Sequence, residues 1–332
     1  MKILITAPFS ETALNLLREA GLEIDYQSWL DTGKLYLGQS LLSLIQQSNP
    51  DILIVEGDEV KKDIIENVRL KLIGSVRNDP NNIDVSLATQ KRIPVISVPG
   101  RNTISVAELT IGLMLAQLRN IISAERLLKD EFLIDDFRDF ANMYTRLVGS
   151  ELHDKKVGII GLGTIGMEVA KRLQVFGSQL LVYDPYITEE RVKTVNGSHV
   201  DLHTLLKESD IITIHCIPTD ETRRMLGKAE LSLMKKSAIL INTARASIVD
   251  EDALYNVLKT GDIAGAALDV FSMEPVDSDN RFLELGNVTV MPHMGGNTKE
   301  TIERQSASIS RDVLTFIRGE KPKNLLNPEV YE

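Results

Sequence analysis

Residues 157–166 read Val157-Gly158-Ile159-Ile160-Gly161-Leu162-Gly163-Thr164-Ile165-Gly166, an apolar run that leads directly into a G-x-G-x-x-G signature. In such a turn Gly161 permits a tight reversal, Gly163 lets the backbone approach a pyrophosphate, and Gly166 lets helix and strand pack closely. An amphipathic helix follows, and the N–H groups of its first turn are available to phosphate oxygens. The pattern therefore predicts a strand, a turn and a helix that bind a dinucleotide.

The acidic partner of this motif stands at the end of the next apolar run, residues 179–184. Asp184 is placed to accept hydrogen bonds from the adenosine ribose hydroxyls, and its charge would repel a 2′-phosphate. We therefore expect NAD rather than NADP. A lone G-x-G-x-x-G also occurs in ordinary turns, but the strand before it, the helix after it and Asp184 together favour dinucleotide binding.

The composition of the 332-residue chain, 43% hydrophobic and 25% charged, is typical of a globular protein with two domains. A net charge of −10 argues against nucleic acid or an anionic membrane as the main partner. No apolar run reaches the ~18 residues that span a bilayer, and the first residues lack a signal-peptide cleavage site. Cys216 is the only cysteine, so no internal disulfide can form. We expect a cytoplasmic protein.

Strand-like and helical patterns alternate along both halves of the chain, which predicts parallel sheets covered by helices on both faces. In the first half a helix is expected from Ser10 to Ala20, and Gly21 ends it. The expected strands of this half are 2–7, 51–55, 70–76 and 93–98, and its other expected helices are 41–47, 61–67 and 83–90. In the second half the expected strands are 157–160, 180–183, 211–215, 238–242, 265–270 and 288–291.

Two helical segments stand out beyond this alternation. The residues from Ile104 to Lys129 predict one long, largely buried helix. Those from Asp130 to Gly149 predict a segment that extends from the domain and packs on another surface, such as a second subunit. A further helix is expected from Thr298 to Arg318, before a Pro- and Asn-rich tail.

Three short segments of the second half follow strands and carry groups for chemistry: Arg245, Glu274 and His293. Ligands of open α/β sheets bind beyond the carboxyl ends of strands, so these side chains could converge near a nicotinamide. Arginine pairs bidentately with a carboxylate, histidine can exchange a proton near neutral pH, and a glutamate beside it favours the imidazolium. Singly, each residue has an ordinary structural interpretation. Together they favour a site that transfers hydride to a 2-oxo acid.

Several other residues are weaker candidates for a functional role. His199 and His203 are spaced i,i+4, but without an H-E-x-x-H motif we expect surface residues and no metal site. His215 either lines the cofactor or is structural, and Cys216 is read as a small apolar wall residue. Arg77 and Asn78 follow a strand of the first half and could meet an anionic substrate. Arg77 and Arg101 also hint at a second anionic group such as a phosphate.

At these residues the chain resembles the D-isomer-specific 2-hydroxyacid dehydrogenase family. The resemblance covers nearly the whole chain and rests on motifs at 161–166, 183–185, 242–245, 268–275 and 292–296. It departs where Val76-Arg77-Asn78-Asp79-Pro80 replaces a glycine-rich loop, and where Ala246 replaces a usual glycine.

The resemblance implies two Rossmann-like or flavodoxin-like parallel-sheet domains with a cleft between them. Residues 1–102 and 298–332 would form a discontinuous substrate domain, and 103–297 an NAD-binding domain with a helical arm that makes a homodimer. Arg245 would hold the substrate, His293 would be the acid/base, and Glu274 would pair with it. Asp269 would bind the carboxamide side of the nicotinamide, and the backbone of Val76, Arg77 and Asn78 the substrate carboxylate. The other implied cofactor residues are Gly161, Gly163, Thr164, Ile165, Gly166, Asp184, Cys216, Pro218, Thr243, Ala244 and Gly296, beside Arg245 and His293.

The expected activity is interconversion of a small D-2-hydroxy acid, such as D-3-phosphoglycerate, or the acid formed from glyoxylate or hydroxypyruvate, with its 2-oxo acid. Formate dehydrogenase of the same fold is disfavoured, because it carries glutamine where Glu274 stands. An NAD(H)-sensing module, like the related corepressors, is the alternative from another class, and turnover with a panel of 2-oxo acids separates it from an enzyme.

Overall fold

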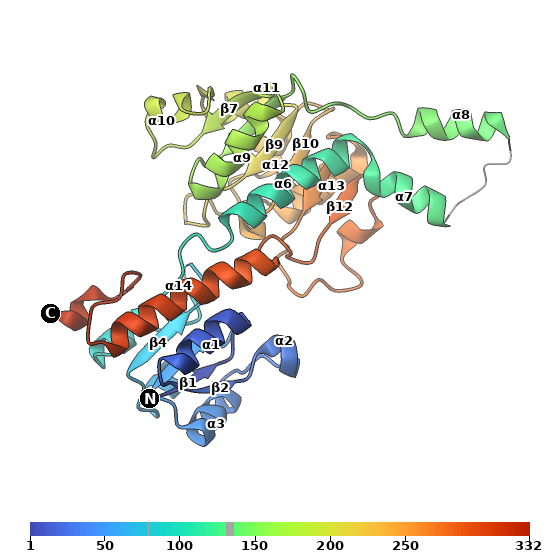
Figure 1. Ribbon diagram of the computed structural model, residues 1–332. Coiled ribbons are helices and arrows are strands. Elements are labelled where there is room, and N and C mark those ends of the chain that lie inside the picture. Colours follow the sequence, from blue (N-terminus) through green and yellow to red (C-terminus); the bar gives the residue numbers. More distant parts are fainter. Residues whose placement is uncertain (79, 131–135) are drawn as a thin grey trace. The chain divides into compact units, whose positions relative to one another are not determined.

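The computed structural model describes residues 1–78, 80–130 and 136–332, which form two α/β units (Figure 1). Unit 1 contains Met1–Arg101 and Asn297–Glu332, and unit 2 contains Asn102–Gly296. Two parts of the sequence interpretation lie outside the described residues: Asp79, in the turn after the third strand expected in the first half, and residues 131–135, in the segment expected to extend from the domain.

Unit 1 is built on a five-stranded parallel sheet in the order β2-β1-β3-β4-β5. Its central strands are buried along their whole length, which explains their continuous apolar sequences. The sequence did not predict β2, a half-exposed edge strand in which charged and apolar residues alternate. The strands are β1 (Lys2–Ile5), β2 (Glu23–Tyr26), β3 (Ile52–Val55), β4 (Leu72–Ser75) and β5 (Val95–Ile96).

Helices cover both faces of this sheet. They are α1 (Glu11–Glu19), α2 (Trp29–Thr32), α3 (Gln39–Ser48), α4 (Lys62–Ile65), α5 (Val85–Gln90), α14 (Lys299–Ile317) and the 3₁₀ helix η3 (Pro328–Tyr331). One core packs α1 and α14 on the sheet, and the other packs α3, α4 and α5. Ser10 caps α1 as expected, its hydroxyl accepting from the Ala13 N–H. The chain returns to this unit because Ile309 and Val313 of α14 are fully buried in its core.

Unit 2 is built on a seven-stranded parallel sheet in the order β12-β11-β10-β9-β6-β7-β8. The chain starts at β6, winds outward through β7 and β8, and then returns to β9 on the other side of β6. Ligands bind at such a reversal point, outside the carboxyl ends of the strands. The strands are β6 (Lys156–Ile160), β7 (Gln179–Tyr183), β8 (Ser198–His199), β9 (Ile211–Ile214), β10 (Ile239–Asn242), β11 (Gly265–Leu268) and β12 (Val288–Val290).

The helices of unit 2 also form two layers. One core contains α6 and α9, and the other contains α11, α12 and α13. The helices are α6 (Thr103–Leu118), α7 (Ile121–Asp130), α8 (Phe137–Arg146), α9 (Thr164–Val175), α10 (Glu189–Lys193), α11 (Leu202–Glu208), α12 (Lys228–Leu231) and α13 (Glu251–Thr260), with 3₁₀ helices η1 (Ala246–Ile248) and η2 (Arg281–Glu284). Among the described residues no helix is both long and apolar enough to cross a bilayer.

The prediction of one helix from Ile104 to Lys129 was wrong in its middle. Asn120 adopts a left-handed backbone conformation with φ of 53°, which ends α6 and starts α7 in a new direction. The predicted burial holds for α6, where Ala107, Ile111 and Met114 face the core.

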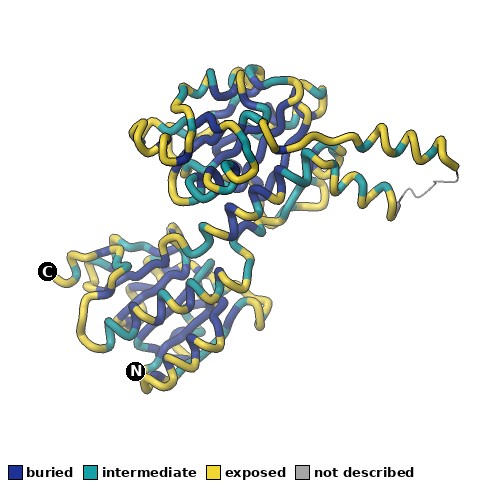
Figure 2. The backbone as a smooth tube through the Cα atoms, turned by 45° about the horizontal axis from the view of Figure 1, so that its top comes forward, coloured by how far each residue is buried: buried dark blue, intermediate teal, exposed yellow. Residues whose placement is uncertain are grey.

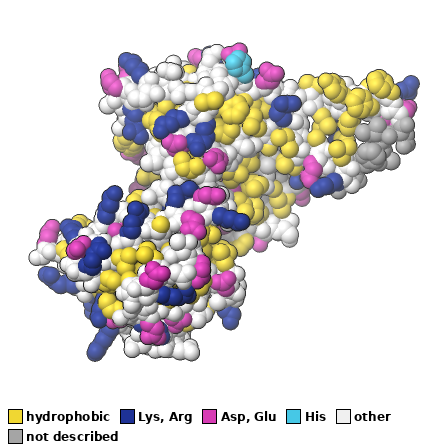
Figure 3. Space-filling view, in the orientation of Figure 1, with side chains coloured by type: hydrophobic (Ala, Val, Ile, Leu, Met, Phe, Trp, Pro, Cys, Tyr) yellow, Lys and Arg dark blue, Asp and Glu magenta, His cyan; other side chains and the backbone are white. Residues whose placement is uncertain are grey.

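Helices α7 and α8, which we call the arm, stand away from the core of unit 2 and carry mostly exposed or half-exposed residues (Figure 2). Hydrophobic side chains gather on the arm (Figure 3). Phe137, Phe140 and Tyr144 follow one another along one side of α8, with ring centroids 5.8 and 6.2 Å apart. Phe137 is 80% exposed and Tyr144 68% exposed. Such a row on a globular protein indicates a contact surface.

Candidate active site

The turn between β6 and α9 requires two of its glycines for steric reasons. Gly161 has φ of 92°, and a Cβ there would lie 2.7 Å from the backbone nitrogen of Cys216. A Cβ on Gly166 would overlap the carbonyl oxygen of Gly161. Gly163 differs, because a Cβ there would meet nothing within 4 Å. The space beyond Gly163 is therefore open at the N-terminus of α9, which fits the approach of a pyrophosphate to the first amides of that helix.

Asp184 directly follows β7 and touches this turn. Its Oδ2 accepts a hydrogen bond from the Leu162 N–H at 2.9 Å, and its Oδ1 accepts one from the Tyr186 N–H at 3.0 Å. The guanidinium of Arg191 donates to the Leu162 carbonyl oxygen, from Nε at 3.3 Å and Nη2 at 3.2 Å. The acid predicted for the ribose is thus fixed beside the glycine turn by backbone donors.

The end of β9 forms the wall on the other side of the turn. The His215 N–H donates to the Ile160 carbonyl at 2.7 Å, and its ring Nε2 lies 2.9 Å from the Thr213 hydroxyl. Burial lowers the pKa of His215 to about 3, so its ring is neutral. Burial likewise raises the pKa of the Cys216 thiol to about 11, in keeping with an apolar wall residue. Pro218 follows and is exposed.

Arg245 follows β10 on a loop that Asn242 shapes. The Asn242 Oδ1 accepts from the Ala244 N–H at 3.0 Å, and its Nδ2 donates to the Arg245 carbonyl at 3.0 Å. Thr243 is buried, and its hydroxyl lies 2.9 Å from that of Thr110 in α6. The side chain of Arg245 is exposed and donates to the Ala244 carbonyl at 2.7 Å. No carboxylate pairs with it in the described part of the chain, so its charge is available to an anion.

Glu274 and His293 meet beyond the ends of β11 and β12. His293 Nδ1 lies 2.6 Å from Glu274 Oε2, and Glu274 Oε1 accepts from the Phe271 N–H at 3.0 Å. An ionised carboxylate only accepts hydrogen bonds, so Nδ1 carries the hydrogen of this contact. The other ring nitrogen, Nε2, is then the one that can exchange a proton with a ligand. His293 has φ of 56°, an uncommon conformation for a residue with a side chain, and such residues cluster at functional sites.

Asp269 holds the loop that carries His293, a role that the sequence interpretation missed. Its Oδ1 accepts from the Met294 N–H at 2.6 Å and its Oδ2 from the Gly295 N–H at 2.8 Å. Burial raises the pKa of Asp269, while these two N–H groups and the charge of His293 oppose that rise. The signal was present in the sequence, since an acid follows β11 directly and a Gly-Gly pair follows the histidine.

The strand order brings most of the predicted residues to one edge of the unit 2 sheet. The residues that follow the carboxyl ends of its strands are the motif glycines, Asp184, Cys216, Arg245, Glu274 and His293. Thr164 and Ile165 begin α9, and Gly296 ends the His293 loop. The substrate residues Val76, Arg77 and Asn78 follow β4 in unit 1, and their contact with a substrate stays a prediction.

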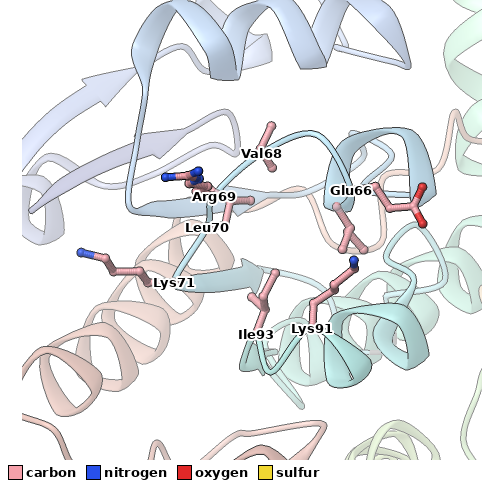
Figure 4. Close-up of a pocket in the computed structure, with 8 residues that line it drawn as sticks. Glu66, Val68, Arg69, Leu70, Lys71, Lys91 and Ile93 are labelled. Carbon is pink, nitrogen blue, oxygen red and sulfur yellow. The ribbon is translucent and has the colours of Figure 1, made fainter.

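Two other sets of residues are not part of this edge. His199 lies in β8 and His203 in α11, so the pair does not share a helix, and the described residues contain no cluster that could hold a metal. A hollow of about 370 Å³ in unit 1 is lined by Arg69, Lys71 and Lys91 among others (Figure 4). It precedes β4 and β5, at the amino ends of the strands, where no predicted site residue lies.

The chain is similar to known proteins over most of its length. The family described as D-isomer specific 2-hydroxyacid dehydrogenase, NAD binding domain, matches residues 111–295. A D-3-phosphoglycerate dehydrogenase of Methanocaldococcus jannaschii is 40% identical over 331 residues. The match covers 98% of this chain, and the chain spans only 59% of the length of that protein. A glyoxylate reductase of Thermococcus litoralis is 36% identical, with 99% of this chain and 97% of that protein covered. The structure of an Aquifex aeolicus D-lactate dehydrogenase complexed with NAD and lactic acid matches with a TM-score of 0.75 and 28% identity, over 96% of each chain.

Proposed function

This chain belongs to the D-isomer-specific 2-hydroxyacid dehydrogenase family, and we propose that it interconverts a small D-2-hydroxy acid and its 2-oxo acid with NAD. The observation that carries this proposal is the contact of 2.6 Å between His293 and Glu274, at the edge of the NAD-binding sheet that also carries the exposed Arg245. The names of the relatives include both phosphoglycerate dehydrogenase and glyoxylate reductase, so the family alone leaves the substrate open.

Each of the three side chains has one part in the reduction. Bound NADH supplies the hydride that reaches the carbonyl carbon. His293 donates a proton from Nε2 to the carbonyl oxygen, and in the oxidation the same nitrogen accepts it. Glu274 orients the ring through Nδ1 and stabilises its charged form. Arg245 binds the carboxylate of the substrate with its planar fork.

The remaining proposed contacts surround these three residues. The pyrophosphate binds at Gly161, Gly163, Thr164, Ile165 and Gly166, and the ribose binds at Asp184. The cofactor is also lined by Arg245 and His293 and by Cys216, Pro218, Thr243, Ala244, Asp269 and Gly296. Val76, Arg77 and Asn78 of unit 1 contribute contacts to the substrate.

The test is steady-state oxidation of NADH with glyoxylate, hydroxypyruvate, pyruvate, phosphohydroxypyruvate and 2-oxoglutarate. We expect turnover with at least one of them, and its loss in His293→Ala while NADH still binds. His203→Ala, which removes an exposed histidine of α11, is the control and keeps full activity. Retained turnover in His293→Ala contradicts the assignment, and binding of NADH without turnover of any acid favours the NAD(H)-sensing alternative.

We also propose that the protein is a cytoplasmic homodimer that forms through the arm. The exposed aromatic row of α8 supports this, because an apolar row of that kind is more stable against a copy of itself than in water.

A further inference from the structure

An ion pair lies at the carboxyl edge of the unit 1 sheet, beside the residues proposed to contact the substrate. Glu56 is the first residue after β3, and Val76 is the first after β4. The two strands pair in parallel, with Val55 opposite Ser75, and the Val76 N–H donates to the Val55 carbonyl at 3.0 Å. Glu56 and Val76 are therefore neighbours at this edge.

The carboxylate of Glu56 is held on both oxygens. Its Oε1 lies 2.6 Å from Arg101 Nη1, and its Oε2 accepts from the Trp29 indole N–H at 3.0 Å. The Glu56 side chain is 19% exposed and that of Arg101 16% exposed, so both are largely removed from water. An ion pair that is largely buried keeps much of its strength, since solvent and salt screen it little.

Arg101 has further partners that fix it in place. Its Nη1 also donates to the Gln305 Oε1, and the Gln305 Nε2 donates to the Pro8 carbonyl at 2.8 Å. The Arg304 Nε donates to the Arg101 carbonyl at 2.8 Å. The guanidinium that could have received a phosphate is thus held inside unit 1 by Glu56 and Gln305.

We propose that Glu56 is a specificity-determining residue that restricts the substrate to 2-oxo acids with one anionic group, their own carboxylate. This rests on the proposed function. Glu56 neutralises Arg101, so the phosphate of a substrate that approaches this edge finds that guanidinium already paired with a carboxylate. The preferred substrates are then small acids with an uncharged substituent, such as glyoxylate or hydroxypyruvate. This differs from the phosphoglycerate in the name of the Methanocaldococcus jannaschii relative.

The test compares kcat/KM for hydroxypyruvate and phosphohydroxypyruvate, which differ by the phosphate, in the full-length protein with NADH. The unchanged protein prefers hydroxypyruvate. In Glu56→Gln the single amide oxygen can accept from either Trp29 or Arg101, and the charge of Arg101 is uncompensated. The ratio of kcat/KM for phosphohydroxypyruvate to that for hydroxypyruvate therefore rises about tenfold or more. The double variant Glu56→Gln/Arg101→Gln loses this gain.

The matched control lies at the other end of the same strand. Asp51 directly precedes β3 and pairs with Lys71 at 2.7 Å. Asp51→Asn removes a carboxylate from an ion pair of unit 1, as Glu56→Gln does, and leaves the substrate ratio unchanged. A ratio of two substrates also cancels any difference in the amount of folded enzyme.

Calorimetry with 3-phospho-D-glycerate gives a readout that does not need turnover. Glu56→Gln binds this ligand about tenfold or more tightly than the unchanged protein does. The proposal is overturned if the unchanged protein prefers phosphohydroxypyruvate, if Glu56→Gln changes neither ratio nor binding, or if the double variant keeps the gain. Absence of turnover with every 2-oxo acid overturns the proposed function instead, and the binding measurement then still decides the role of Glu56.

Discussion

His293 Nδ1 lies 2.6 Å from Glu274 Oε2, and this contact joins the loops that follow two neighbouring strands of the unit 2 sheet. Hydrogen bonds from backbone N–H groups hold both of these loops in place. Asp269 holds the N–H groups of Met294 and Gly295, and the Phe271 N–H binds the second oxygen of Glu274. The imidazole is therefore oriented before any substrate arrives, which reduces the reorganisation that catalysis needs.

Glu274→Gln lowers kcat by about a hundredfold, because the amide no longer stabilises a charged imidazole. The dissociation constant of NADH, measured by fluorescence titration, stays within about twofold, since Glu274 acts through His293. Glu284→Gln, which changes an exposed carboxylate of η2, is the control and keeps kcat. A rise in KM at constant kcat would contradict the assigned role.

Two glycines of the motif respond to alanine in opposite ways. Gly166→Ala places a methyl group on the Gly161 carbonyl oxygen, so we expect a loss of about 1–3 kcal/mol in the free energy of unfolding. Gly163→Ala places it in open space, so the free energy of unfolding changes by less than about 0.5 kcal/mol, while NADH binds about tenfold more weakly. Urea denaturation and fluorescence titration measure the two effects. Normal NADH binding by Gly163→Ala would show that no phosphate approaches that residue.

Asp184→Ser is expected to relax the preference for NAD. Removal of the carboxylate removes its repulsion of a 2′-phosphate, and Arg191, which binds the Leu162 carbonyl, remains nearby as a cation. The ratio of kcat/KM for NADPH to that for NADH should rise about tenfold or more. The additional change Arg191→Gln should reduce this gain, while Glu189→Gln alone leaves the ratio as it was. An unchanged ratio in Asp184→Ser would place the ribose elsewhere.

His215 makes the protein less stable in acid. Its folded-state pKa is about 3, whereas the ordinary value is 6.5, so the unfolded chain takes up one more proton between these values. The stability associated with the neutral ring is complete above pH 6.5 and falls as the pH drops, by at most about 1.4 kcal/mol per pH unit. Urea denaturation between pH 7.5 and 4.5 should show a shallower loss in His215→Gln than in the unchanged protein. His203→Gln, at an exposed position, keeps the original slope.

The arm should control the oligomeric state. Phe137→Glu combined with Tyr144→Glu puts two charges on the aromatic row, and sedimentation velocity at micromolar concentration should then show a monomer. Asn142→Glu, on the opposite side of α8, leaves the dimer intact. A dimer that persists in the double variant would place the subunit contact on another surface.

Much of the fold could be predicted from local rules. Apolar strands separated by amphipathic helices predicted both parallel sheets, and the capping by Ser10 was predicted from its hydroxyl. The edge strands β2 and β8 escaped prediction, because they are short and partly exposed and so lack a continuous apolar run. The turn at Asn120 also escaped it, since the residues on both sides favour helix and only the backbone of Asn120 breaks the pattern.

By itself the sequence determined the glycine turn, the acid that follows β7 and the three side chains with the right chemistry, because these depend on neighbours along the chain. Tertiary structure alone decided that Asp269 holds the loop after His293 and that Arg101 is paired with Glu56, and it supplied the contact between Glu274 and His293 that the family resemblance had only implied. Those contacts join residues 19, 25 and 45 positions apart (293 − 274, 294 − 269 and 101 − 56). The physical reason is that a hydrogen bond or ion pair depends on distance in space, which the order of the strands sets and the spacing along the chain does not.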